Sequence, residues 1–272
     1  MKKGTKGILI IVLLVVIGLI YYFYTTKEDV PIEEPAPEAA SKVAKIDYSV
    51  KKTYPHDTGS YTQGLIIYKG DMYEGTGLNN ASRLMKIDVN TGKAQKTHAL
   101  DKEFFGEGIT ILNDTIYQLT WQNNVVFVYT LDFKKVKEFK LNTEGWGITT
   151  DGQLLMVSDG SNNLYFYDPA TFNLLKTVPV KEDSYPAQYL NELEFIDGFI
   201  YANQYTSPYI LKIDPKDGNV VGKINVNELW QRVKTIHPGV DVPNGIAYDE
   251  ATKKIYITGK LWPELYEIAL SK

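Results

Sequence analysis

Five short phrases of similar sequence recur along the chain, and each begins with a residue whose side chain can hydrogen-bond to a ligand or stack on it. The phrases start Gln-Gly-Leu, Glu-Gly-Ile, Trp-Gly-Ile, Asn-Glu-Leu and Asn-Gly-Ile, at spacings of 44, 39, 45 and 53 residues. One carboxylate among three carboxamides and an indole is suited to moving a proton while holding a polar substrate. The five first residues are Gln63, Glu107, Trp146, Asn191 and Asn244.

The segments that follow these residues predict the elements that position them. Each phrase runs through a turn rich in Asp, Asn or Gly into a second apolar segment. A period near 45 residues built from short β-type runs is typical of a β-propeller blade. Because equivalent positions of the blades converge on one axis, we expect the five residues to form a ring at the mouth of a central channel. The sequence therefore predicts an all-β, five-bladed propeller over residues 45–272.

A second ring follows from the same repeat. Fourteen residues after each ring position, the second strand of the blade returns to the end where the first one started. In the fifth repeat the turn at 249–254 is about two residues longer, which moves the equivalent position to a lysine. We expect the two rings together to form a pocket. The second ring consists of Gly77, Trp121, Gly160, Tyr205 and Lys260.

Two further segments fit this architecture. The last repeat, 244–272, is one strand short of a full blade, and the strand-like segment 44–54 is expected to supply the missing strand and close the ring without an exposed edge. The long spacing before the fifth phrase contains residues 226–233, which read as a short inserted helix. That helix would either form a rim at the channel entrance or cover the sheet.

The first 44 residues are predicted to lie outside the propeller. Residues 1–6 carry Lys2, Lys3 and Lys6, and residues 7–24 contain no charge. Eighteen such residues span roughly 27 Å as a helix, enough to cross the hydrocarbon of a bilayer. We expect a transmembrane signal anchor with residues 1–6 in the cytoplasm, a Pro- and Glu-rich linker at 25–44, and an extracytoplasmic catalytic domain, periplasmic or extracellular. The alternative is a signal peptide that is cleaved before secretion.

Composition excludes several classes of function. The formal charge of −4 and the pI near 5.5 argue against nucleic-acid binding. The chain has no cysteine, which excludes disulfides, a thiolate zinc site and a cysteine nucleophile. Its 3 histidines show no spacing typical of metal ligands, so a histidine-based metal site is not expected.

Seven motifs in register resemble those of one enzyme family, the plant-type and bacterial glutaminyl-peptide cyclotransferases. The resemblance runs from about residue 46 to 271, in the family's order and spacing. It implies a five-bladed propeller that converts the N-terminal glutamine of peptides and proteins into 5-oxoproline with release of ammonia, without a catalytic metal or cofactor. The motifs are YTQGL (61–65), FGEGI (105–109), TW (120–121), GWG (145–147), LNELE (190–194), PNGIA (243–247) and TGKLWPELYE (258–267).

The residues of the two rings suit this reaction. Glu107 is the only acid of the first ring, so we expect it to carry the proton from the attacking α-amine to the departing ammonia. Gln63, Asn191 or Lys260 would donate hydrogen bonds to the developing oxyanion. Aromatic walls would hold the substrate folded and exclude water. The expected substrate-binding residues are Tyr61, Trp121, Trp146, Tyr205 and Asn244, in a protein expected to be a monomer.

Two departures from the family pattern and two alternative functions remain at this point. Tyr61 stands where the family usually has Phe, and Tyr205 where it usually has a pocket Trp, which affects substrate preference more than reaction type. Glu107, Asn191 and Asn244 also imitate the oxygen ligands of a divalent-cation-dependent propeller lactonase or hydrolase, although a single carboxylate makes a weak cation site. The third hypothesis is a propeller that binds peptides without catalysis.

Overall fold

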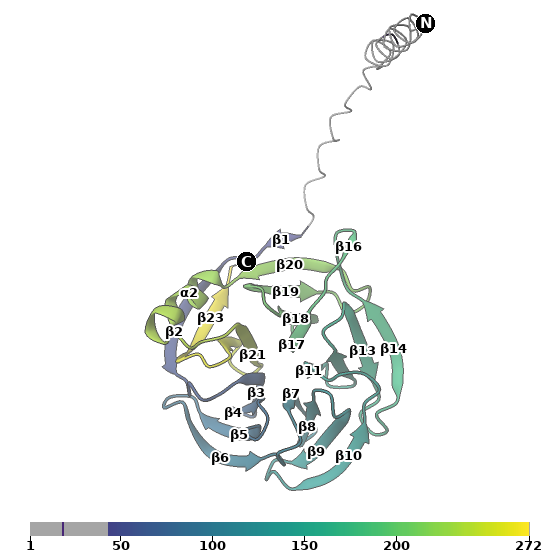
Figure 1. The fold of residues 1–272 in the computed structure, drawn as a ribbon, viewed down its shortest axis with the longest axis vertical. Helices are drawn as coiled ribbons and strands as arrows, with labels where there is room; N and C mark the ends of the chain where they lie inside the picture. The colour runs from purple at the N-terminus through teal and green to yellow at the C-terminus, as the bar shows by residue number, and fades with distance from the viewer. Residues whose placement is uncertain (1–17, 19–42, 272) are drawn as a thin grey trace, which may run out of the picture. The chain divides into compact units, whose positions relative to one another are not determined.

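The computed structural model describes residue 18 and residues 43–271, and within the latter range the chain forms five sheets around a common axis (Figure 1). The predicted five-bladed propeller is confirmed. The first blade consists of β3 (Thr62–Tyr68), β4 (Asp71–Thr76), β5 (Arg83–Asp88) and β6 (Lys93–Ala99). The second consists of β7 (Gly106–Leu112), β8 (Thr115–Thr120), β9 (Val125–Thr130) and β10 (Lys135–Lys140).

The remaining blades repeat the same antiparallel order, from the axis outward. The third consists of β11 (Ile148–Thr150), β12 (Leu155–Ser158), β13 (Asn163–Tyr167) and β14 (Leu174–Pro179). The fourth consists of β17 (Leu190–Ile196), β18 (Phe199–Gln204), β19 (Tyr209–Ile213) and β20 (Val220–Asn225), with β1 (Ala44–Lys45) added in parallel to β20. A small hairpin of β15 (Lys181–Glu182) and β16 (Tyr185–Pro186) lies between the third and fourth blades in sequence.

The fifth blade combines both ends of the propeller segment. Its inner strands are β21 (Pro243–Asp249), β22 (Lys254–Gly259) and β23 (Glu264–Leu270). Its outermost strand is β2 (Tyr48–Pro55), which pairs antiparallel with β23 so that Tyr48 lies opposite Leu270 and Pro55 opposite Glu264. β2 thus begins and ends slightly later than the segment 44–54 that was expected to form this strand. Ala44 pairs instead with Gly222 in β20 of the fourth blade.

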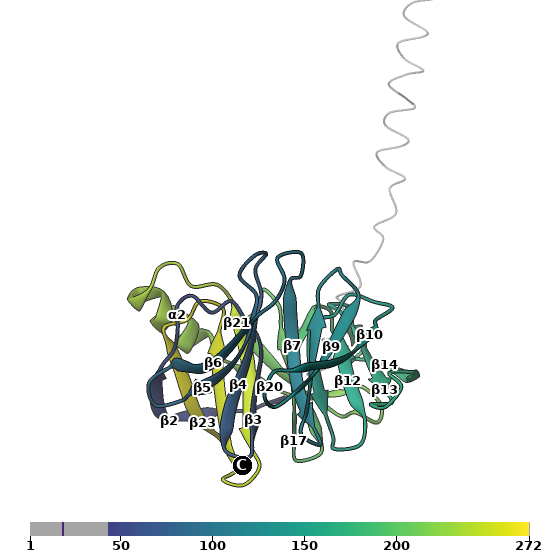
Figure 2. The ribbon, with the colours of Figure 1, turned by 90° about the horizontal axis from the view of Figure 1, so that it is seen from below.

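The core lies between the blades rather than within them. Among residues 43–271, five clusters of buried apolar side chains occur, one at each contact between neighbouring blades, including the contact between the fifth blade and the first. Each blade is a sheet whose two faces are both covered by neighbours, and each innermost strand contacts those of the adjacent blades. Viewed from the side, the strands run between the two ends of the ring (Figure 2). The ends of the innermost strands are therefore held rigidly around the axis.

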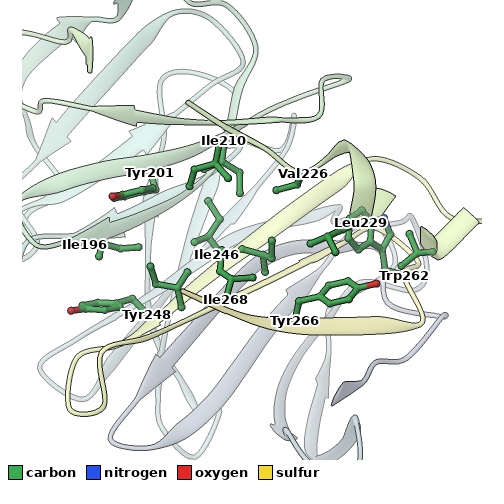
Figure 3. Packing of buried hydrophobic residues seen from close by; sticks show 14 residues of the cluster. Ile196, Tyr201, Ile210, Val226, Leu229, Ile246, Tyr248, Trp262, Tyr266 and Ile268 are labelled. Atoms are coloured by element: carbon green, nitrogen blue, oxygen red, sulfur yellow. The ribbon is translucent and has the colours of Figure 1, made fainter. Parts of the chain in front are cut away.

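The inserted helix is α2 (Asn227–Ile236), and it lies at the periphery of the ring (Figure 1). Its buried residues Leu229 and Val233 pack with Trp262 in the cluster between the fourth and fifth blades (Figure 3). Arg232 forms a two-pronged ion pair with Glu264 of β23, at 2.9 Å for each bond. These contacts support the interpretation that the helix covers the sheet.

Apart from residue 18, the predicted anchor at 7–24 lies outside the described residues, and so does most of the predicted linker at 25–44. Within the part of the chain that the structure describes, no helix has the length and apolar character needed to cross a membrane.

Candidate functional site

Four of the five first-ring residues lie at irregularities in strand pairing. In each of these blades the register between the innermost strand and the next strand shifts at the ring residue. An extra residue in one strand of a pair releases that residue from the ladder and re-aims its side chain. The bulges therefore explain why these side chains turn out of the sheet. They fall at Gln63, Glu107, Asn191 and Asn244.

The glycine that follows most ring residues permits close approach of neighbouring blades. A Cβ atom on Gly147 would overlap the carbonyl oxygen of Asn191 in the next blade. The amide of Gly147 donates to Ser158 Oγ at 2.8 Å, and that hydroxyl donates to the same carbonyl at 2.7 Å. Backbone contact between innermost strands thus fixes the position of one ring residue relative to the next.

The two rings form a pocket of about 250 Å³ at one end of the channel. It contains eight of the nine residues that were expected to form the site, together with Phe105. Its lining residues are Tyr61, Gln63, Phe105, Glu107, Trp121, Trp146, Asn191, Tyr205 and Lys260.

Asn244 lies behind the pocket rather than in its lining. It is completely buried, and its Nδ2 donates to Gln63 Oε1 at 3.3 Å and to the backbone oxygen of Thr62 at 2.9 Å. Gln63 in turn donates from Nε2 to Glu107 Oε1 at 3.0 Å. A chain of hydrogen bonds therefore runs from the fifth blade through the first to the carboxylate of the second, and it fixes the orientation of Glu107.

The carboxylate of Glu107 is only 5% exposed, and its environment favours the protonated form. Burial raises the pKa of Glu107 well above its usual value, the Lys260 cation opposes this shift, and the Glu144 anion adds to it. Burial likewise lowers the pKa of Lys260, against the opposing effect of the carboxylates of Glu107 and Asp241. Perturbation of both groups toward neutrality is what proton transfer near neutral pH requires.

Lys260 lies close to the rings of two tyrosines, Tyr61 and Tyr205. Its Nζ lies 4.6 Å from the ring centre of Tyr61 and 5.1 Å from that of Tyr205. The hydroxyl of Tyr61 donates to Asp241 Oδ2 at 2.9 Å, a contact that Phe could not make. The added hydroxyl thus ties the first blade to the loop before β21.

The aromatic walls are packed edge to face. Phe105 contacts Tyr61 and Trp121, with ring centres 6.3 Å and 5.6 Å apart, and Trp146 contacts Tyr205 at 5.6 Å. The two glycines of the second ring make room for these walls. A Cβ atom on Gly77 would overlap the ring of Phe105, and a Cβ atom on Gly160 would overlap the ring of Trp146. The alternation of small and aromatic positions around the second ring is therefore a packing requirement of the pocket.

The polar groups below the ring bind the blades together. Glu192 occupies the place that glycine takes in the other four phrases. Its carboxylate accepts hydrogen bonds from the amides of Leu65 at 3.2 Å and Ile246 at 2.9 Å, which belong to the first and fifth blades. Glu194 accepts from the amide of Tyr248 at 2.8 Å.

Among residues 43–271, no three acidic, histidine or cysteine side chains gather as a metal ion would need.

Three residues at the site were not singled out from the sequence. Phe105 lines the pocket, Asp241 binds Tyr61, and Glu144 accepts hydrogen bonds from the indoles of Trp121 and Trp146. A usable signal existed for one of them. Phe105 stands two residues before the ring position Glu107, as Tyr61 stands two residues before Gln63.

Comparison with known proteins gives a consistent result. The profile of the family described as glutamine cyclotransferase matches residues 23–270. A glutaminyl-peptide cyclotransferase of Arabidopsis thaliana is 40% identical over 230 residues, which cover 83% of this chain and 72% of the relative. A crystal structure of Myxococcus xanthus glutaminyl cyclase superposes with a TM-score of 0.80 at 33% identity, over 84% of this chain and 98% of that one. The chain belongs to the glutamine cyclotransferase family.

Proposed function

We propose that this enzyme cyclises the N-terminal glutamine of peptides and proteins, with Glu107 as the proton shuttle. The observation that carries the proposal is a buried carboxylate, oriented by Gln63, in a small pocket that also contains Lys260 and Asn191. A pocket of about 250 Å³ is slightly smaller than most ligand sites, which suits one amino-acid residue. The family relationship supports the same reaction.

The reaction needs one carbon–nitrogen bond to form and another to break. The α-amine nitrogen attacks the side-chain carboxamide carbon, and Glu107 accepts the proton that this nitrogen loses. The same carboxyl then returns the proton to the carboxamide nitrogen, and ammonia departs as the tetrahedral intermediate collapses. A group whose pKa is raised by burial can serve in both steps.

The remaining residues have separate roles in this mechanism. Lys260 and the carboxamide of Asn191 would donate to the oxyanion, while Gln63 holds Glu107 and Asn244 holds Gln63. The rings of Tyr61, Phe105, Trp121, Trp146 and Tyr205 would keep the glutamine folded with its amine against its carboxamide and exclude water.

Mass spectrometry of a Gln-initiated peptide tests the proposal. Cyclisation removes ammonia, a loss of about 17 Da, and Glu107→Gln should lower turnover by about 100-fold or more because the amide cannot return a proton. Glu182→Gln is the matched control, since Glu182 pairs with Lys223 at 2.8 Å away from the pocket. Near-full turnover of Glu107→Gln would contradict the role of Glu107. Activity lost with EDTA and restored by calcium would instead support the divalent-cation hydrolase.

Two features of the chain's wider organisation belong to the same proposal. The pairing of β2 with β23 would lock the ring, because the last blade takes its outer strand from the beginning of the propeller segment. Residues 7–24 would anchor the chain with the propeller on the extracytoplasmic side, acting as a monomer on peptide N-termini.

A further inference from the structure

Glu144 lies outside the pocket lining, yet its hydrogen bonds go to residues that build the pocket. It occupies the segment between β10 and β11, two residues before Trp146. Oε2 accepts from the indole nitrogens of Trp121 at 2.8 Å and Trp146 at 3.0 Å, and Oε1 accepts from Gln122 Nε2 at 3.1 Å. One carboxylate oxygen therefore joins the walls contributed by two neighbouring blades.

The backbone around Glu144 brings the carboxylate to this position. The amide of Gly145 donates to the carbonyl of Trp121 at 3.2 Å, and a Cβ atom on Gly145 would lie 2.8 Å from the carbonyl oxygen of Thr120. The segment thus lies directly against the end of β8, where a side chain at position 145 would push it away. The close approach places Glu144 between the two indoles.

The chemistry of these contacts makes them strong constraints. An indole N–H can only donate, and hydrogen bonds to an ionised acceptor are about twice as strong as neutral ones. Although burial raises the pKa of Glu144, donation from Trp146, Gln122 and Trp121 outweighs it and lowers the pKa overall. Glu144 is accordingly an anion across the neutral range, and its negative charge adds to the rise in the pKa of the buried Glu107 carboxyl.

We propose that Glu144 is a positioning residue for the cyclisation, acting both as a clamp that fixes the two tryptophan walls and as a fixed negative charge that favours the protonated form of Glu107. The proposal rests on the proposed function. The charged and titratable groups that interact electrostatically with Glu107 are Lys260, Glu144 and Tyr61. Of these, Glu144 is the one that opposes the effect of Lys260.

Two substitutions separate the clamp from the charge. Glu144→Gln keeps a carbonyl oxygen for the two indoles but removes the charge, whereas Glu144→Ala removes both. Loss of the clamp should raise KM for a Gln-initiated peptide about tenfold in the Ala variant, while the Gln variant stays within about twofold of wild type. Loss of the charge should lower the pKa of Glu107 and move the acid limb of the kcat/KM profile to lower pH, by about half a unit in both variants.

A readout without turnover keeps this test independent of the proposed function. Acrylamide quenching of tryptophan fluorescence should increase in Glu144→Ala, because the freed indoles gain access to solvent, and stay at the wild-type level in Glu144→Gln.

Glu182→Ala is the matched control and should change neither quenching nor kinetics. Thermal unfolding verifies that each variant is folded. Unchanged quenching and KM in Glu144→Ala, or a pH profile of Glu144→Gln that coincides with wild type, would overturn the proposal. Absence of cyclisation by the wild-type enzyme would refute the function, while quenching would still report on the clamp.

Discussion

Replacement of Glu194 by Gln should change how the stability of the propeller depends on pH. Glu194 is 5% exposed, and it accepts hydrogen bonds from the amide of Tyr248 and, at 3.4 Å, from Thr149 Oγ1. Burial raises the pKa of Glu194 to about 8, against the effect of these donors. In the unfolded chain the pKa returns to the ordinary value of 4.5. Between pH 4.5 and about pH 8, Glu194 therefore keeps its proton in the folded state and loses it in the unfolded state.

The sign and size of the effect follow from this difference. A carboxyl with a raised pKa contributes its full stability below pH 4.5, and it loses that contribution as the pH rises through the folded pKa of about 8. Each pH unit in this window is worth at most about 1.4 kcal/mol, so between pH 5 and pH 7 wild type should lose about 2 to 3 kcal/mol from this group. Gln is neutral in both states and loses nothing.

Urea unfolding at pH 5, 6, 7 and 8 measures the effect. The free energy of unfolding of Glu194→Gln minus that of wild type should increase with pH over this range. Taking this difference cancels the contribution of titrating groups that do not interact with Glu194. Glu182→Gln, at a half-exposed ion pair with Lys223, should show no such trend. A difference between Glu194→Gln and wild type that is constant with pH would refute the reasoning, because it would show that Glu194 is ionised in the folded state.

Two further outcomes are expected. Gly147→Ala should destabilise the protein by about 3 kcal/mol or more and reduce activity, because the added Cβ would overlap the carbonyl oxygen of Asn191. Gly152→Ala is the control: the space around Gly152 is open but its φ is +88°, so this variant should cost only about 1 kcal/mol. Equal shifts of the thermal unfolding midpoint in the two variants would contradict this. If residues 7–24 anchor the chain, the full-length protein should stay in the membrane pellet after carbonate extraction, and a soluble form beginning after about residue 24 would identify a cleaved signal peptide instead.

The repeat pattern predicted the architecture and most of the pocket, because a propeller converts a sequence period into positions around one axis. Counting from Gln63 and Glu107 was enough to place residues of different blades at one site. The same arithmetic could not show that Asn244 turns toward Gln63 and away from the pocket. That orientation depends on the local bulge and on a partner 181 residues away, and neither is written in the spacing.

Contacts that depend on loop conformation were also beyond the sequence. Asp241 lies in the segment before β21, and it meets Tyr61 only because the fifth and first blades are neighbours in the closed ring. Glu144 required a loop that folds against the end of β8. In both cases a period of about 45 residues locates the blade but not the path of the chain between strands.

The charges around the pocket suggest why one carboxylate is sufficient for the proposed reaction. Before substrate binds, Glu107 is buried and faces one anion and one cation, Glu144 and Lys260, so burial decides its protonation. A peptide N-terminus brings an ammonium group into the same space, and a nearby cation favours the ionised carboxylate. Substrate binding would therefore favour Glu107 as the base. The ammonium first releases one proton to solvent and becomes the neutral amine that attacks, and Glu107 accepts the second proton, which this nitrogen loses as the new carbon–nitrogen bond forms. Glu107 then gives that proton to the carboxamide nitrogen, which leaves as ammonia when its own bond to carbon breaks.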